Sequence, residues 1–178
     1  ATGQESADTA LDGELETLRD RSRDLNRNNA VASGITGTLA DNIVHNGIKP
    51  QSRIDYKSIG ISEQQAVDFQ KSAEKAFEMF SPFASADRRL NFFDMQRLAV
   101  RQIVESGEFV AVRRALPNRP FYLTLDVIEP DRLDSPGQDY LNQNIKFGVE
   151  KNTYGEPIAY HICKTHPGDN YVSRKNYE

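Results

Sequence analysis

The chain has 178 residues, of which 38% are hydrophobic and 27% are charged, a composition typical of a globular protein. Its formal net charge of −4 argues against a protein that grips nucleic acid through phosphates, because such proteins usually carry a basic surface. No run of about 18 apolar residues occurs, which excludes a transmembrane helix. The single cysteine, Cys163, excludes an intrachain disulfide and favours a reducing compartment.

The first predicted element is one long amphipathic helix from Leu15 to Val44. Its apolar residues recur at spacings of three, four and seven, the periodicity of a helix with one buried face. These residues are Leu15, Leu18, Leu25, Ala32, Ile35, Leu39 and Ile43. Charges of both signs crowd the first half, whereas the apolar half, Ile35 to Val44, is expected to be buried within the domain. The pair Asn46-Gly47 predicts the C-terminal stop.

Two further helices are predicted after residues 48–59, a proline-containing segment typical of an extended arm or an edge strand. Ser62 and Gln65 predict a capping box at the start of the first of these helices. Its apolar stripe consists of Ala66, Phe69, Ala73, Ala76, Phe77 and Phe80. We expect this stripe to be core that packs the helix on a sheet. The other helix has Asn91 as its predicted N-cap and ends at Ser106-Gly107.

The second half of the chain is rich in predicted strands. Apolar and polar residues alternate from Phe121 to Ile128, the pattern of a strand with one buried face. Residues 108–115 precede a Pro-Asn turn and are expected to pair with that strand as a hairpin. A second hairpin is predicted between Ile145–Glu150 and Pro157–Lys164, with Gly155 in its turn.

Helices therefore come first and strands later, an order typical of the α+β class rather than of βαβ units. We predict a long N-terminal amphipathic helix and two further helices packed on a mainly antiparallel sheet of hairpins. Residues 1–13 begin with small polar residues and are expected to be a flexible N-terminus without a signal peptide. Residues 14–60 comprise the long helix and the extended arm, and residues 61–178 form a single α+β domain.

Three side chains near the end of the chain raise the alternative of a metal-dependent enzyme or a zinc-binding module. His161 and Cys163 share one face of the predicted strand and His166 follows after a short gap, so the three could bind zinc. Asp169 is the nearby candidate for a fourth ligand, since no second Cys or His pair stands at a suitable spacing. The competing interpretation is a strand histidine beside a half-buried thiol, with no cofactor.

An acidic loop follows the strand that ends at Ile128. Its charged residues, Glu129, Asp131, Arg132 and Asp134, predict either an internal arginine–carboxylate network or a surface for a protein partner. Asp131 with Glu150-Lys151 is superficially similar to the core of Mg²⁺-dependent nucleases. That core needs one residue between Glu and Lys, so that both point to the same face of a strand. Here Glu150 and Lys151 are adjacent, so the match fails. Phosphate-binding glycine loops and a nucleophile elbow are also missing from the sequence, and no enzymatic activity is predicted.

Six segments are distinctive as sequence strings. They are Leu18–Ala30, which contains R-S-R-D-L-N-R-N-N, Gly47-Ile-Lys-Pro50, Val127-Ile-Glu-Pro-Asp-Arg-Leu133, Gly148-Val-Glu150, Tyr154-Gly-Glu-Pro157 and Ala159-Tyr-His-Ile162. In this order and spacing they resemble the lambda-type family of bacteriophage portal proteins, over about the whole chain. The resemblance implies the wing-like part and early core of a portal subunit. It also implies that stem, DNA-facing tunnel loop, clip and crown follow residue 178.

The resemblance further implies a structural subunit of a dodecameric ring at one capsid vertex, located in the virion and, during assembly, in the host cytoplasm. Such rings dock the terminase motor, pass DNA inward during packaging and release it at ejection. The implied partners are other copies of the subunit, terminase, capsid and head–tail connector proteins, and double-stranded DNA that passes without sequence-specific contact. No membrane and no cofactor are implied. An acidic chain suits this role, because repulsion lets the duplex slide.

Within such a ring, the arginines of the long helix are the candidate subunit-interface residues. They are Arg19, Arg21, Arg23 and Arg27. Arginine pairs bidentately with carboxylates, and this density of charge exceeds what a lone surface helix needs. We therefore expect a neighbouring subunit to meet these residues. No catalytic, cofactor-binding or metal-binding residue is predicted under this interpretation.

Overall fold

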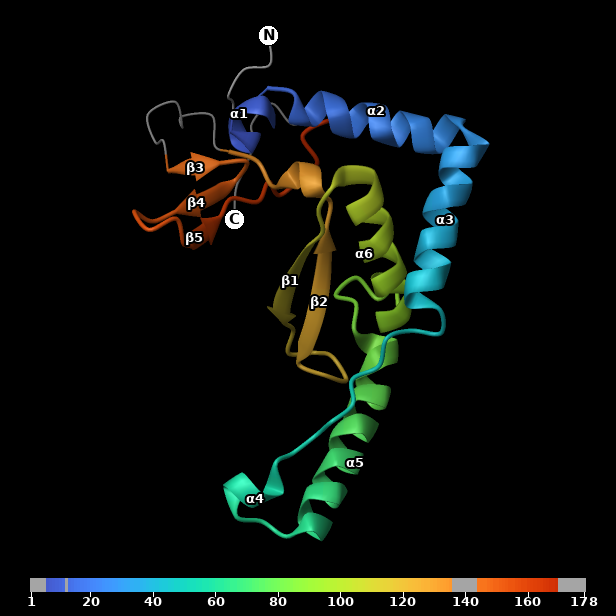
Figure 1. Cartoon of the computed structure of the whole chain (residues 1–178), viewed down its shortest axis with the longest axis vertical. Helices are drawn as coiled ribbons and strands as arrows, with labels where there is room; N and C mark the ends of the chain where they lie inside the picture. Colours follow the sequence, from blue (N-terminus) through green and yellow to red (C-terminus); the bar gives the residue numbers. More distant parts are fainter. Residues whose placement is uncertain (1–5, 12, 136–143, 170–178) are drawn as a thin grey trace.

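The computed structural model describes residues 6–11, 13–135 and 144–169 and has an α+β fold (Figure 1). The helices are α1 (Ala7–Leu11), α2 (Leu15–Asn28), α3 (Ala30–Val44), α4 (Tyr56–Ile59), α5 (Glu63–Phe80) and α6 (Phe92–Ser106), with 3-10 turns η1 (Ser81–Phe83) and η2 (Pro130–Arg132). The strands are β1 (Val110–Ala115), β2 (Leu123–Ile128), β3 (Ile145–Lys146), β4 (Val149–Lys151) and β5 (Pro157–Tyr160). Among the described residues, no helix is long and apolar enough to span a bilayer.

The predicted flexible N-terminus falls only partly within these ranges. Residues 7–11 form the short helix α1, and residues 1–5 and 12 lie outside the described part of the chain.

The single long helix predicted from Leu15 to Val44 is wrong, because the chain breaks at Asn29. This residue has φ −122° and ψ 115°, far from helical values. Its N–H donates to the carbonyl of Leu25 and so ends α2. Its side-chain oxygen accepts from the N–H groups of Val31 (2.9 Å) and Ala32 (3.1 Å) and so caps α3. Asn29 is thus a one-residue joint between two helices that run in different directions (Figure 1).

Helices α2, α3 and α6 pack against one another. The buried face of α3 consists of Thr36, Ala40 and Val44, spaced four residues apart. Ile35 and Ile43, by contrast, are exposed. The prediction that the apolar half of the long helix would be buried is therefore wrong for its largest side chains, because a face of smaller residues meets α6.

The predicted extended arm contains no strand within residues 48–59, and its last residues form α4 instead. The capping box at the start of α5 is confirmed, with reciprocal hydrogen bonds between Ser62 and Gln65. Helix α5 projects away from the sheets (Figure 1). Its predicted core stripe is confirmed in part. Ala66 is buried near the start of the helix. Near the end of the helix, Phe77 is half-buried and its ring lies 5.1 Å from that of Phe92. Phe69 is 60% exposed and is not core.

The strands form two small antiparallel sheets. The predicted first hairpin is confirmed as β1–β2, with Val110 opposite Ile128. The predicted second hairpin is a three-stranded sheet, β3–β4–β5, because a tight turn at Phe147 (φ 50°) and Gly148 (φ 76°) splits its first strand. Gly155 has φ 82° in the turn before β5, as predicted.

A small apolar core joins the two sheets. Ile128, Leu133 and Ile162 are buried together, and Val110, Val112 and Val149 pack on them half-buried. Leu133 and Ile162 also form an isolated antiparallel bridge. This core fixes η2, which lies between Ile128 and Leu133, at the point where α2 crosses the body of the molecule (Figure 1).

Candidate functional site

The site is built where the inner face of α2 meets the end of α6 and the turn η2. Arg19 and Arg23 are four residues apart and so lie on the same face of α2. Opposite them lie Glu108, just after α6, and Asp131 in η2. His166 approaches Asp131 from the far end of the chain. We name these five residues the α2 charge cluster.

Asp131 is the centre of the α2 charge cluster. It pairs with Arg23, whose Nη2 also donates to the Ser106 hydroxyl at 3.1 Å. Its other carboxylate oxygen lies 3.6 Å from Nη1 of Arg19, and Arg19 in turn pairs with Glu108. Arg19 is only 8% exposed, so its guanidinium is largely withdrawn from water. The inner face of α2 is thus attached to the body through charged side chains rather than through apolar packing.

Burial and pairing act in opposite directions on the two main charges. Burial lowers the pKa of Arg19, while the nearby charge of Asp131 raises it in part. Burial by itself raises the pKa of Asp131. Hydrogen bonds from Arg23 and His166, with the charges of Arg23 and Arg19, outweigh that effect and leave the pKa of Asp131 below its usual value. Asp131 is therefore held in its charged form.

The turn that carries Asp131 follows from its local sequence. Pro130 begins η2 one residue after the end of β2, and the N–H of Leu133 donates to the carbonyl of Pro130. The predicted internal arginine–carboxylate network exists, but its arginines come from α2. Arg132 instead donates from Nε to the carbonyl of Cys163 at 2.6 Å. Glu108 was missed by the sequence analysis, because nothing local marks a residue at a helix end as the partner of a distant arginine.

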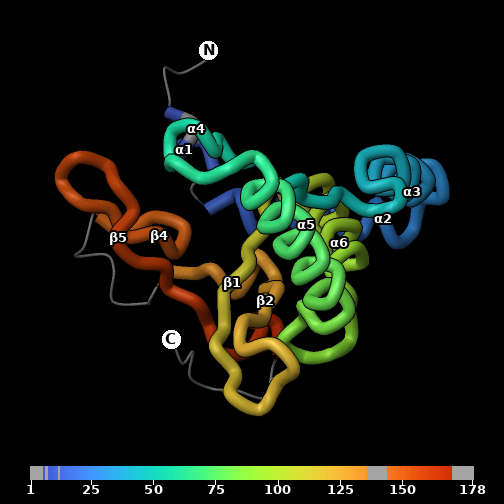
Figure 2. The backbone as a smooth tube through the Cα atoms, turned by 90° about the horizontal axis from the view of Figure 1, so that it is seen from below, coloured from blue at the N-terminus to red at the C-terminus, as the bar shows by residue number. Residues whose placement is uncertain are grey.

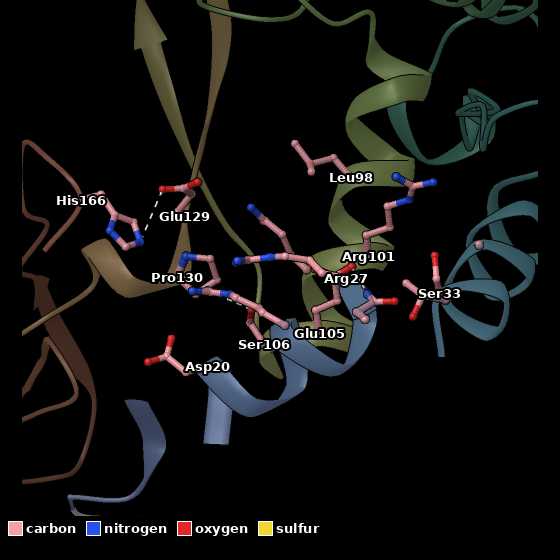
Figure 3. A pocket seen from close by; sticks show the side chains of 15 residues that line it. Asp20, Arg27, Ser33, Leu98, Arg101, Glu105, Ser106, Glu129, Pro130 and His166 are labelled. Atoms are coloured by element: carbon pink, nitrogen blue, oxygen red, sulfur yellow. Dashed lines mark hydrogen bonds and ion pairs between the residues drawn. The ribbon is translucent and has the colours of Figure 1, made fainter. Parts of the chain in front are cut away.

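A polar hollow of about 480 Å³ adjoins the α2 charge cluster (Figure 3). His166 and Glu129 stand at one side of it, with His166 Nε2 3.8 Å from the Glu129 carboxylate. Arg27 and Arg101 stand toward α3. The lining mixes arginines with carboxylates, and so the hollow carries no strong net charge of either sign.

The four candidate interface arginines divide into two pairs. Arg19 and Arg23 point inward and belong to the α2 charge cluster. Arg21 and Arg27 are exposed, and neither makes an ion pair with a described residue. Contact with a neighbouring subunit remains a prediction for all four, and only the exposed pair has side chains accessible to one.

The three residues of the zinc alternative have separate partners. His161 Nε2 lies 3.1 Å from the Glu150 carboxylate, and His166 Nε2 lies 3.2 Å from that of Asp131. Cys163 is buried, and its N–H donates to the carbonyl of Arg132. Within residues 6–11, 13–135 and 144–169, no three His, Cys, Asp or Glu side chains converge on a point that could hold a metal ion.

Fold and site together define an α+β protein whose buried charges hold its own elements in place. Similarity to known proteins identifies the family of this chain. The whole chain, residues 1–178, matches a family model described as "Phage portal protein, lambda family". The chain therefore belongs to the lambda family of phage portal proteins, as the sequence motifs predicted.

Three relatives carry names consistent with this family. A "Probable portal protein" of Halomonas phage phiHAP-1 is 30% identical over 93% of this chain and 32% of the relative. "Portal protein B" of Escherichia phage lambda is 28% identical over 92% of the chain and 32% of the relative. A "Portal protein" of Escherichia phage N15 is 26% identical over 89% and 31%. The chain spans about a third of the length of these relatives.

Proposed function

We propose that this chain acts as part of a structural subunit of a phage portal ring at the capsid vertex. The ring would form the conduit for DNA during packaging and ejection and would dock the terminase motor. The observation that carries the proposal is the match of all 178 residues to the lambda portal family. The subunit would not be an enzyme, and the ATP hydrolysis that drives packaging would belong to its partner.

The proposed partners are those expected of the family. Copies of the subunit would form a ring, expected to be dodecameric, that contacts terminase, capsid and head–tail connector proteins. Double-stranded DNA would pass through without sequence-specific contact, which the net charge of −4 supports, because an acidic wall does not hold phosphates. The ring would be part of the virion and would assemble in the host cytoplasm.

Arg21 and Arg27 are the proposed contacts of α2 with a neighbouring subunit. Their exposure supports this role, and so does the fixed setting of α2, whose inner arginines are held by Asp131 and Glu108. Because the backbone of α2 is already ordered, a contact with a carboxylate would order only the arginine side chain.

Ring formation tests the proposal. The complete subunit, purified and examined by native mass spectrometry and electron microscopy, should form closed rings. It should also leave plasmid DNA intact in the presence of Mg²⁺ and should not hydrolyse ATP. A complete subunit that stays monomeric at all concentrations, or nuclease or ATPase turnover that co-purifies with it, would contradict the proposal.

A further inference from the structure

The first two helices add no buried apolar side chain to the described part of the protein. We name the described residues 6–11 and 13–28, which contain α1 and α2, the N-terminal strap, and the other described residues the body. Every buried apolar side chain among the described residues lies in the body. Arg19 is the buried residue of α2, whereas Leu18 and Leu25 are 46% and 54% exposed. Separation of the strap would therefore leave the buried apolar core of the body intact.

Polar contacts join the strap to the body. The ion pairs are those of the α2 charge cluster, between two arginines of α2 and two carboxylates of the body. Further along α2, the side-chain amide of Asn26 donates to the carboxylate of Glu105 near the end of α6. Water can hydrate all of these groups once the strap has left, and this hydration offsets much of the pairing that is lost.

The contact between strap and body is also narrow. The hollow of about 480 Å³ described above adjoins the C-terminal half of α2 (Figure 3). A second hollow of about 820 Å³ lies between the N-terminal half of α2 and residues 133–135 and 145–147 of the body. Asp20 lines both hollows. Release of the strap would therefore not have to open a closely packed interior.

Asn29 allows the body to keep its structure without the strap. The N-terminus of α3 is capped by the side chain of Asn29 itself, which accepts from the N–H groups of Val31 and Ala32. Rotation about the N–Cα bond of Asn29 would move α2 and leave this cap in place, because all of the capping atoms lie beyond that bond. The φ of −122° lies well inside the extended region, which spans about −60° to −160°. The buried face of α3 packs on α6, which lies beside α3 in both views (Figures 1 and 2).

We propose that the N-terminal strap is a releasable element, held to the body by the α2 charge cluster and hinged at Asn29. In the attached state α2 is helical and its inner arginines are paired. In the released state the body stays folded and α2 loses helical structure. An isolated helix of 14 residues is marginal in water, and the side chain of Glu14 does not cap α2. Attachment thus determines whether the exposed arginines of α2 are presented on a helix, and it is a property of the single subunit that does not depend on ring formation.

Hydrogen exchange of the complete subunit, followed by mass spectrometry, tests the inference. Arg19→Gln with Arg23→Gln removes the pairing charges from α2 alone, and glutamine has nearly the helix propensity of arginine. The amides of α2 should then exchange at least about a hundredfold faster than in the wild type, close to the rate of an unfolded chain, while those of α6 and β2 stay protected. Asp131→Asn removes the pairing from the side of the body and should also speed exchange in α2. Arg88→Gln with Arg89→Gln is the matched control, because it makes the same change of charge at two exposed residues of the body and should leave α2 as protected as in the wild type.

Three results would overturn the inference. If α2 is as well protected in Arg19→Gln with Arg23→Gln as in the control variant, contacts outside the α2 charge cluster hold the strap. If α2, α6 and β2 exchange at one common rate in that variant, strap and body unfold as a single unit. If α2 already exchanges like an unfolded chain in the wild type, the strap is not attached at all.

Discussion

Asp131→Ala is the substitution to which this structure should be most sensitive. The change removes the one carboxylate that faces both Arg19 and Arg23, and it leaves both guanidinium groups in place. The side chains of the three residues are 14%, 9% and 18% exposed, so water could compensate the lost charge only in part. Glu108 would remain as a partner for Arg19 alone.

Removal of one partner from a buried pair typically costs about 3–5 kcal/mol. The total free energy of unfolding of a domain is about 5–15 kcal/mol, so the loss would be a large part of it. For a chain of this size each kcal/mol lowers the melting temperature by about 2–4 °C, which predicts a decrease of about 6–20 °C. The exposed pair Asp41–Arg97 supplies the control, because its side chains are 65% and 42% exposed. Asp41→Ala should cost about 0–1 kcal/mol.

Differential scanning calorimetry of the two variants and the wild type measures both effects. A double-mutant cycle with Arg23→Ala then isolates the pairwise contribution, which should be about 0.5–3 kcal/mol. The reasoning would be refuted if Asp131→Ala melted within error of Asp41→Ala. In that case the α2 charge cluster would be solvated in solution, and α2 would be held by other contacts.

The other predictions concern pH, assembly and packing. The pKa of Asp131 is lower in the folded protein than in the unfolded chain, so the stability that its charged form contributes is fully present above about pH 4. This contribution is lost as the pH falls through the lower folded pKa. The free energy of unfolding of the wild type should therefore decrease more steeply in acid than that of Asp131→Asn. Arg21→Glu with Arg27→Glu should leave circular dichroism unchanged and reduce the yield of rings in native mass spectra, and rings at wild-type yield would contradict the interface role. Phe77→Ala should cost about 2 kcal/mol in thermal melts, less than a fully buried phenylalanine, whereas Phe69→Ala should stay within about 0.5 kcal/mol of the wild type.

Local chemistry explains what could be predicted from the sequence. The capping box of Ser62 and Gln65, the N-cap Asn91 and the β1–β2 hairpin all depend on residues close together in the chain, and all three are present. The break at Asn29 is also local, but it was missed because apolar periodicity continues across it. Asparagine has low helix propensity and a side chain suited to capping, and here capping prevailed.

The face of α2 that turns inward could not be predicted, because the residue that determines it is distant in the sequence. Periodicity placed Leu18 and Leu25 on the inner face, yet both are exposed and Arg19 is buried. The carboxylate that pairs with the inward-facing arginines is Asp131, which lies 108 residues beyond Arg23. A hydrophobic pattern identifies the two faces of a helix, but only the surrounding charges decide which of them turns inward.

The α2 charge cluster also has a geometric consequence. Apolar contacts tolerate small rotations of a helix about its axis, because they are not directional. Hydrogen-bonded ion pairs hold donor and acceptor at defined angles, and successive residues on a helix differ by about 100° in direction. Arg23, which is hydrogen-bonded to Asp131, and Arg19, which pairs with Glu108, therefore restrict the rotation of α2 about its axis. In a ring of identical subunits, this restriction would orient Arg21 and Arg27 in the same direction relative to the body of every copy.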